Sequence, residues 1–195
     1  QPNKKESKFK LAHILWLIAW FGITHGINEH LDMWAIIRSR NPVLDAARWF
    51  ILVISYIFLF EFGKRILVLA REALNQQKGI LPLFRVWLLP AMLVFILIAG
   101  FLSSDFWRTG SILARYLIGF SGGSLTGIGL ISYYQYEKKI LGQLKVKKYF
   151  IWASLSFLFY AILSGLVVPK GNFFPSNLLN TDSFLLTVKI PVQVL

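Results

Sequence analysis

The chain has 195 residues, of which 56% are hydrophobic and 15% are charged, and it carries a formal net charge of +12. Soluble domains carry about 25% charged residues, so the composition excludes an ordinary soluble domain and predicts an integral membrane protein. The positive charge does not indicate a nucleic-acid partner, because the basic residues lie between hydrophobic segments, as the positive-inside rule expects. The sequence contains no cysteine, which excludes disulfides and thiolate metal ligands within it.

The hydrophobic segments predict a polytopic bundle of membrane-spanning helices. A span needs about 20 predominantly apolar residues. We expect five complete spans and the start of a sixth, at residues 10–28, 43–62, 83–103, 111–135, 149–168 and 182–195. The last segment stops while still apolar, and a helix that ended within the bilayer would leave its carbonyl groups unpaired. We therefore predict a single all-α membrane domain over residues 1–195, in a chain that continues beyond Leu195.

The distribution of Lys and Arg predicts how these spans are oriented. One side of the membrane would hold Lys4, Lys5, Lys8, Lys10, Lys64, Arg65, Arg71, Lys78, Arg85, Lys138, Lys139, Lys145, Lys147 and Lys148. The other side would hold Arg38, Arg40, Arg48, Arg108, Arg115 and Lys170, which nearby acidic residues almost balance. Because an excess of Lys and Arg marks the cytoplasmic side, we expect the N-terminus to be cytoplasmic.

The first span ends in an unusually polar stretch, GITHGINEHLDMW at residues 22–34. On a helix, residues three, four and seven apart share a face, so His25, Glu29 and Asp32 line one side. Ionisable groups at membrane depth usually face a bundle interior and are functional candidates. We therefore predict a ligand pocket at the outer end of this span, closed by two tryptophans. Its predicted residues are His25, Asn28, Glu29, Asp32, Trp34 and, from the fourth span, Arg115, with Trp20 as the second tryptophan.

Two other interpretations of this stretch stay open. In the first, the helix simply leaves the membrane and its polar side chains meet water. In the second, His25, Glu29 and Asp32 bind a metal such as Zn or Fe, since imidazole and carboxylate groups are suitable ligands. Two observations argue against a metal or haem site. His25 and His30 point in different directions on one helix, and a haem held by two histidines would need a second protomer. The sequence assigns no cofactor.

The fourth span contains a ladder of small residues. Gly119, Gly123 and Gly127 fall four residues apart, a pattern that lets another helix approach closely. We interpret them as helix-packing residues, and the alternative is a helix that slides or rotates during signalling, because glycine also weakens helix rigidity.

Arg115, near the outer end of the same span, requires a carboxylate or headgroup partner. Asp45, Asp105 and Glu29 are the expected partners, which would form an ionic lock beside the pocket. In the final segment, Lys189 and Pro191 predict a hinge in a signalling helix. No phosphate-binding loop, HExxH motif or nucleophile elbow is present, so we predict no catalytic residue.

Three segments together resemble a known class of bacterial membrane region. The stretch at 22–34 is similar to an HG-x-x-EW-x-D signature, FLFEFGKRIL at 58–67 to the inner end of a second span, and NTDSFLLTVKIPVQVL at 180–195 to a closing F-x-x-x-TGIPVQ segment. They resemble the N-terminal multi-span sensory regions of bacterial histidine kinases and diguanylate cyclases, which carry PAS and output domains downstream. In this chain His30 replaces an aromatic residue of that pattern, and Lys189 replaces a glycine.

These observations lead to a functional expectation with two alternatives. We expect a homodimeric signal-input domain in a bacterial cytoplasmic membrane, whose outer pocket detects a small molecule, an ion, pH or the state of the lipid bilayer. Its last span would pass the signal to a cytoplasmic kinase or cyclase. The alternatives are a small transporter or non-catalytic subunit of a membrane complex, and a membrane redox protein that binds metal or haem.

Overall fold

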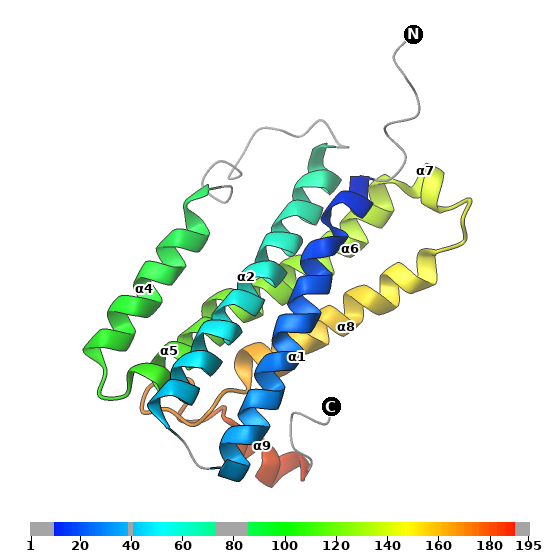
Figure 1. The fold of residues 1–195 in the computed structure, drawn as a ribbon. Helices are drawn as coiled ribbons and strands as arrows, with labels where there is room; N and C mark the ends of the chain where they lie inside the picture. The colour runs from blue at the N-terminus through cyan, green and yellow to red at the C-terminus, as the bar shows by residue number, and fades with distance from the viewer. Residues whose placement is uncertain (1–9, 39–40, 73–85, 190–195) are drawn as a thin grey trace.

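The computed structural model describes residues 10–38, 41–72 and 86–189, and their regular structure is helical. The elements are η1 (Lys10–Ile14), α1 (Leu15–Arg38), α2 (Pro42–Glu72), α4 (Leu88–Leu102), α5 (Phe106–Ala114), η2 (Arg115–Gly119), α6 (Phe120–Tyr136), α7 (Lys138–Leu141), α8 (Lys147–Leu166) and α9 (Thr181–Val188) (Figure 1). One isolated bridge pairs Val168 with Asn180. The predicted all-α fold is confirmed for this part of the chain.

Three of the described helices are long and apolar enough to cross a membrane. They cover Lys10–Ala35, Pro42–Ala70 and Lys147–Leu166, which overlap the expected spans at 10–28, 43–62 and 149–168. The apolar helix α4 has 15 residues, about 22 Å at 1.5 Å per residue, which is less than the bilayer core. The expected span at 111–135 is divided by η2, a π-helical turn, and is rich in Gly, Ser and Thr. The structure therefore supports a membrane association through three spans and not the full set of five.

The expected sixth span is not supported. Helix α9 has eight residues and begins with a capping box, in which Asn180 and Ser183 exchange hydrogen bonds. It ends at Lys189, whose φ of 60° is left-handed and stops the helix. Residues 190–195, with the predicted hinge residue Pro191, lie outside the described residues.

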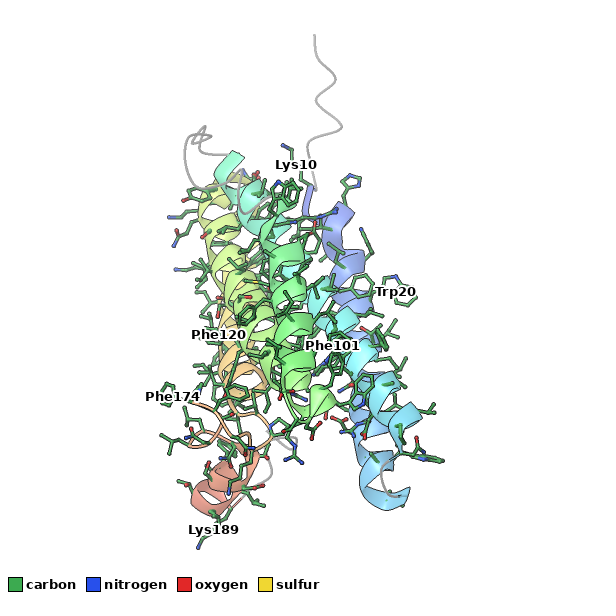
Figure 2. The ribbon with its side chains drawn as sticks, turned by 90° about the vertical axis from the view of Figure 1, so that its left-hand side faces the viewer. Lys10, Trp20, Phe101, Phe120, Phe174 and Lys189 are labelled. Carbon is green, nitrogen blue, oxygen red and sulfur yellow. The ribbon has the colours of Figure 1, made fainter. Side chains whose placement is uncertain are left out.

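The long helices lie side by side and their ends gather at two opposite poles. Figure 1 shows the start of η1, the end of α2 and α7 at one pole, and the end of α1, the start of α2, α5 and α9 at the other. Lys10 and Lys189 mark these two poles in Figure 2. Helix α2 is central, since it packs on both α1 and α6, while α8 packs on α6. Its aromatic side chains Tyr56, Phe60 and Phe62 are almost fully buried.

Helix α6 fits between α2 and α8 because glycines line its two sides. A Cβ atom on Gly122 would lie 2.9 Å from the backbone nitrogen of Phe60 in α2, and one on Gly123 would lie 2.9 Å from the Cβ atom of Ala161 in α8. The other two glycines of the predicted ladder also face neighbours: Gly119 lies against the Tyr56 ring and Gly127 against Leu158. The hydroxyl of Ser154 in α8 donates a 2.6 Å hydrogen bond to the Gly127 carbonyl.

We expect the substitution Gly122→Ala to destabilise the bundle by about 1–3 kcal/mol, because the new methyl group meets the backbone of α2, which cannot move aside. The matched control is Gly26→Ala on α1, where the added Cβ meets nothing within 4 Å. The control should leave stability unchanged or raise it by up to about 1 kcal/mol, since alanine is the better helix former. Reversible unfolding in detergent measures both, and equal effects of the two substitutions would contradict this packing.

Candidate polar cavity at the pole opposite the N-terminus

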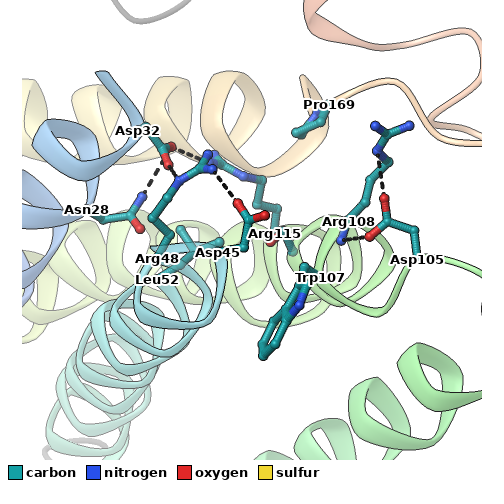
Figure 3. A pocket seen from close by; sticks show the side chains of 11 residues that line it. Asn28, Asp32, Asp45, Arg48, Leu52, Asp105, Trp107, Arg108, Arg115 and Pro169 are labelled. Carbon is teal, nitrogen blue, oxygen red and sulfur yellow. Dashed lines mark hydrogen bonds and ion pairs between the residues drawn. The ribbon is translucent and has the colours of Figure 1, made fainter. Parts of the chain in front are cut away.

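A polar cavity of about 120 Å³ lies between α1, α2, α5 and η2 at the pole away from η1. It is lined by Asn28, Asp32, Asp45, Arg48, Leu52, Asp105, Trp107, Arg108, Ser111, Arg115 and Pro169 (Figure 3). Asn28 and Leu52 are buried, whereas Asp105 and Arg108 are about half exposed. The cavity therefore leads from the surface into the bundle.

Helix starts position several of these side chains. Asn41 accepts a 2.7 Å hydrogen bond from the Leu44 backbone N–H through its side chain, which caps the start of α2 and places Asp45 in the first helical turn. Asp105 caps α5 in the same way, accepting from the Arg108 backbone N–H at 3.0 Å. Acidic side chains suit these positions because helix N-termini carry partial positive charge.

Asp32 is the centre of an ion network that joins three helical elements. Its Oδ1 atom accepts a short hydrogen bond from Nε of Arg48 in α2. Its Oδ2 atom lies 3.9 Å from Nη2 of Arg115, the first residue of η2. Arg48 also donates from Nη1 to Asp45 at 3.0 Å. A single carboxylate on α1 thus holds two arginines from different helices.

Arg115 is largely buried, with 13% of its side chain exposed, but its hydrogen bonding is incomplete. Its Nη1 atom lies 3.4 Å from both the Tyr56 hydroxyl and the Ser164 carbonyl, longer than the usual range of about 2.7–3.2 Å. Its Nε atom is buried without a partner. Arg115 opens the π-helical turn, since the Phe120 N–H donates to the Arg115 carbonyl five residues back. Such turns occur frequently at functional sites.

His25 belongs to a second polar group, deeper in the bundle than the cavity. Its Nε2 atom lies 2.9 Å from the Tyr160 hydroxyl and its Nδ1 atom lies 3.3 Å from the Ser55 hydroxyl. Its ring stacks on Phe21. Glu29 approaches Nε2 at 3.7 Å. Both ring nitrogens of His25 therefore have neighbours, and neither His25 nor Glu29 lines the cavity.

The predicted metal-ligand set is not brought together. His25 faces Tyr160 and Ser55, Asp32 faces Arg48, and His30 turns to the Gly26 carbonyl at 2.8 Å. In the residues that the structure describes, no group of three or more His, Asp or Glu side chains is placed to hold a metal ion.

Two sequence predictions about the pocket are corrected. The tryptophans expected to close it point elsewhere: Trp20 stacks on Phe58 on the outer side of α1 (Figure 2), and Trp34 is 56% exposed. Trp34 lies two residues after Asp32, about 200° around a helix that turns 100° per residue, so the two cannot share a face.

The expected partners of Arg115 are the second correction. Asp45 pairs with Arg48, and Asp105 pairs with Arg108 at 3.4 Å. Each aspartate lies three residues before its arginine on the same helix, and this local pairing occupies it. Asp32 is the carboxylate within 4 Å of Arg115. The third expected partner, Glu29, also attracts Arg115 electrostatically.

The sequence assigned no pocket role to three residues that line the cavity, Arg48, Trp107 and Arg108. It also assigned none to Tyr56 and Tyr160, which contact Arg115 and His25. Arg48 carried a usable signal, because Asp45 and Arg48 lie one helical turn apart at the start of an apolar span. The tyrosines carried none, since a Tyr within a span fits a core position equally well. No family model, no curated protein and no solved structure matches this chain.

Proposed function

We propose that this chain is a membrane-embedded signal-input domain, in which the polar cavity detects a small ligand and the helices around it pass the response to the opposite pole. The main support for the proposal is the hydrogen bonding of Arg115. This largely buried arginine lines the cavity, and its Nε atom has no hydrogen-bond partner. A buried donor without a partner destabilises a protein. The unpaired Nε–H of Arg115 therefore indicates that a ligand in the cavity completes its hydrogen bonding. The resemblance to sensory regions of histidine kinases and diguanylate cyclases points the same way.

The proposal includes a topology. Helix α4 and the continuous run of α5, η2 and α6 would cross the membrane as the third and fourth of five spans, with the N-terminus in the cytoplasm of a bacterial cell. In the larger basic group, Lys10 begins η1 and Lys138 begins α7, and both elements lie at the same pole (Figure 1). That pole would be cytoplasmic, and the cavity would open on the outer side.

The proposed coupling runs through Asp32. A ligand that binds Arg115 would weaken its attraction to Asp32 and change how η2 sits against α1 and α2. Helix α6 continues from η2 to the opposite pole, and its glycines bring it close to α2 and α8, so a shift of η2 would be passed along α6. The shift can be no larger than the difference in ligand affinity between the two states. A homodimer joined to a downstream kinase or cyclase would convert that shift into output.

The test is the output of the full-length protein reconstituted in liposomes, measured as autophosphorylation or cyclase activity. We expect Arg115→Gln to change the ligand-free or stimulated output by about tenfold or more, equivalent to about 1.4 kcal/mol of coupling. The matched control is Arg65→Gln, since Arg65 is an arginine at the other pole, where it pairs with Glu61 at 2.7 Å. Output that is the same in both variants, or a full-length protein without either activity, would contradict the proposal.

A further inference from the structure

Two residues that line the polar cavity each have one unpartnered polar atom, and the two atoms differ in hydrogen-bonding character. Asn28 is 1% exposed, and its Oδ1 atom, an acceptor, has no partner. The Nε atom of Arg115, a donor, has none either. Both residues line the cavity. A ligand that satisfies both must therefore offer an acceptor to one and a donor to the other.

The orientation of the Asn28 amide is fixed by its neighbour. Its Nδ2 atom approaches Asp32 Oδ2 at 3.5 Å, and a carboxylate only accepts hydrogen bonds. The amide must therefore turn its NH₂ group to Asp32, which leaves Oδ1 as the atom that requires a donor. Figure 3 shows Arg48 and Arg115 converging on Asp32 from one side, with Asn28 on the other.

The charges around the cavity are balanced. Three arginines and three aspartates line it: Arg48, Arg108, Arg115, Asp32, Asp45 and Asp105. An added net charge would be left uncompensated in a partly buried site, which is unfavourable. A ligand of zero net charge that carries both signs avoids this penalty. Its negative group suits Arg115, and its positive group suits Asn28 and the Asp45 carboxylate, which contacts Arg48 through Oδ1.

We propose that the cavity binds a small α-amino acid as its zwitterion, with the carboxylate on the Arg115 Nε–H and the ammonium group donating to Asn28 Oδ1. The volume of about 120 Å³ is well below the ~300–1,000 Å³ of sites for drug-sized ligands, so it admits small side chains only. Leu52 and Trp107 supply the apolar wall against which such a side chain would lie. This ligand assignment rests on the proposed function for its biological meaning.

The experiment is a calorimetric titration of the purified chain in nanodiscs with L-alanine, propionate, ethylamine and L-tryptophan. Propionate has the acid alone and ethylamine the amine alone, so each lacks one charge-assisted hydrogen bond. We expect each to bind about tenfold or more weakly than alanine, and tryptophan not to bind. Propionate or ethylamine that binds as tightly as alanine would overturn the proposal, and so would a panel in which nothing binds.

Substitutions then identify the contacts. Asn28→Leu should weaken alanine binding by about tenfold or more while leaving propionate binding unchanged, a split that a merely structural role would not produce. Asn177→Leu, at an exposed asparagine of the same pole, should change neither. If Asn28→Leu does not fold, the panel on the unmodified chain decides the question. If alanine binds but does not change the output, the proposed function is refuted and the ligand class stands. If the output depends on Arg115 but alanine does not bind, the ligand class is refuted and the proposed function stands.

Discussion

The substitution Asp32→Asn is expected to lower the free energy of unfolding by about 2–4 kcal/mol. Asp32 is the only carboxylate within 4 Å of Arg115 in the described structure, and it also accepts from Arg48. Neutralising it removes the nearest carboxylate from the largely buried Arg115, and breaking a buried pair from one side is strongly destabilising. The lower end of the range allows for the part of Asp32 that solvent reaches. Unfolding in detergent, followed by tryptophan fluorescence, measures the change.

Asp105→Asn is the matched control for this prediction. Asp105 is about half exposed, and its two roles are to cap α5 and to pair with Arg108. Asparagine caps helices about as well as aspartate, and exposed ion pairs contribute about 0–1 kcal/mol. We therefore expect a loss below about 1 kcal/mol. If Asp32→Asn is equally mild, Asp32 does not hold the two arginines together.

The substitution Arg115→Met is expected to have the opposite effect on stability. It removes the buried cation and its unpartnered Nε atom, while Asp32 keeps its hydrogen bond to Arg48. Replacing a poorly satisfied buried ion with an apolar side chain is often neutral or stabilising. We expect the free energy of unfolding to stay constant or to rise by about 1–2 kcal/mol, while ligand binding and signal output are lost.

This contrast separates a functional arginine from a structural one. Stability given up at a binding site is regained when the site is removed. The same unfolding measurement as for Asp32→Asn applies, with output measured on the full-length protein. An Arg115→Met variant as unstable as Asp32→Asn would show that Arg115 holds the fold together, and would remove the observation on which the proposed function rests.

The sequence predicted the parts of this site that depend on position along one helix. Asn28 and Asp32 are four residues apart, so a helix brings both to one cavity whatever the rest of the chain does. The need of Arg115 for a carboxylate also followed from its place in an apolar segment. The identity of that carboxylate did not follow from the sequence, because it depends on the rotation of α1 against η2. The π-helical turn at Arg115–Gly119 has no sequence signal either.

The same limit explains the errors. Trp34 was assigned to the pocket from its place in the chain, although its angle on the helix directs it away from Asp32. The segment after Asp182 was read as a span because it is apolar, but the helix ends at Lys189, in a left-handed conformation that hydropathy does not reveal. Helix α4 has only 15 residues, so its apolar composition alone does not establish the third span that the proposed topology assigns to it.

The proposed signal-input domain requires that the cavity open on the outer face of the membrane and that the basic pole face the cytoplasm. The absence of native cysteine makes this directly measurable with single introduced cysteines and a membrane-impermeant maleimide. Asn177 is exposed at the cavity pole, and Gln135 is exposed near the end of α6 at the basic pole. In intact spheroplasts we expect Asn177→Cys to be labelled and Gln135→Cys to be labelled only after the cells are broken. Labelling of Gln135→Cys alone in intact cells would place the cavity on the cytoplasmic side and contradict the proposed topology.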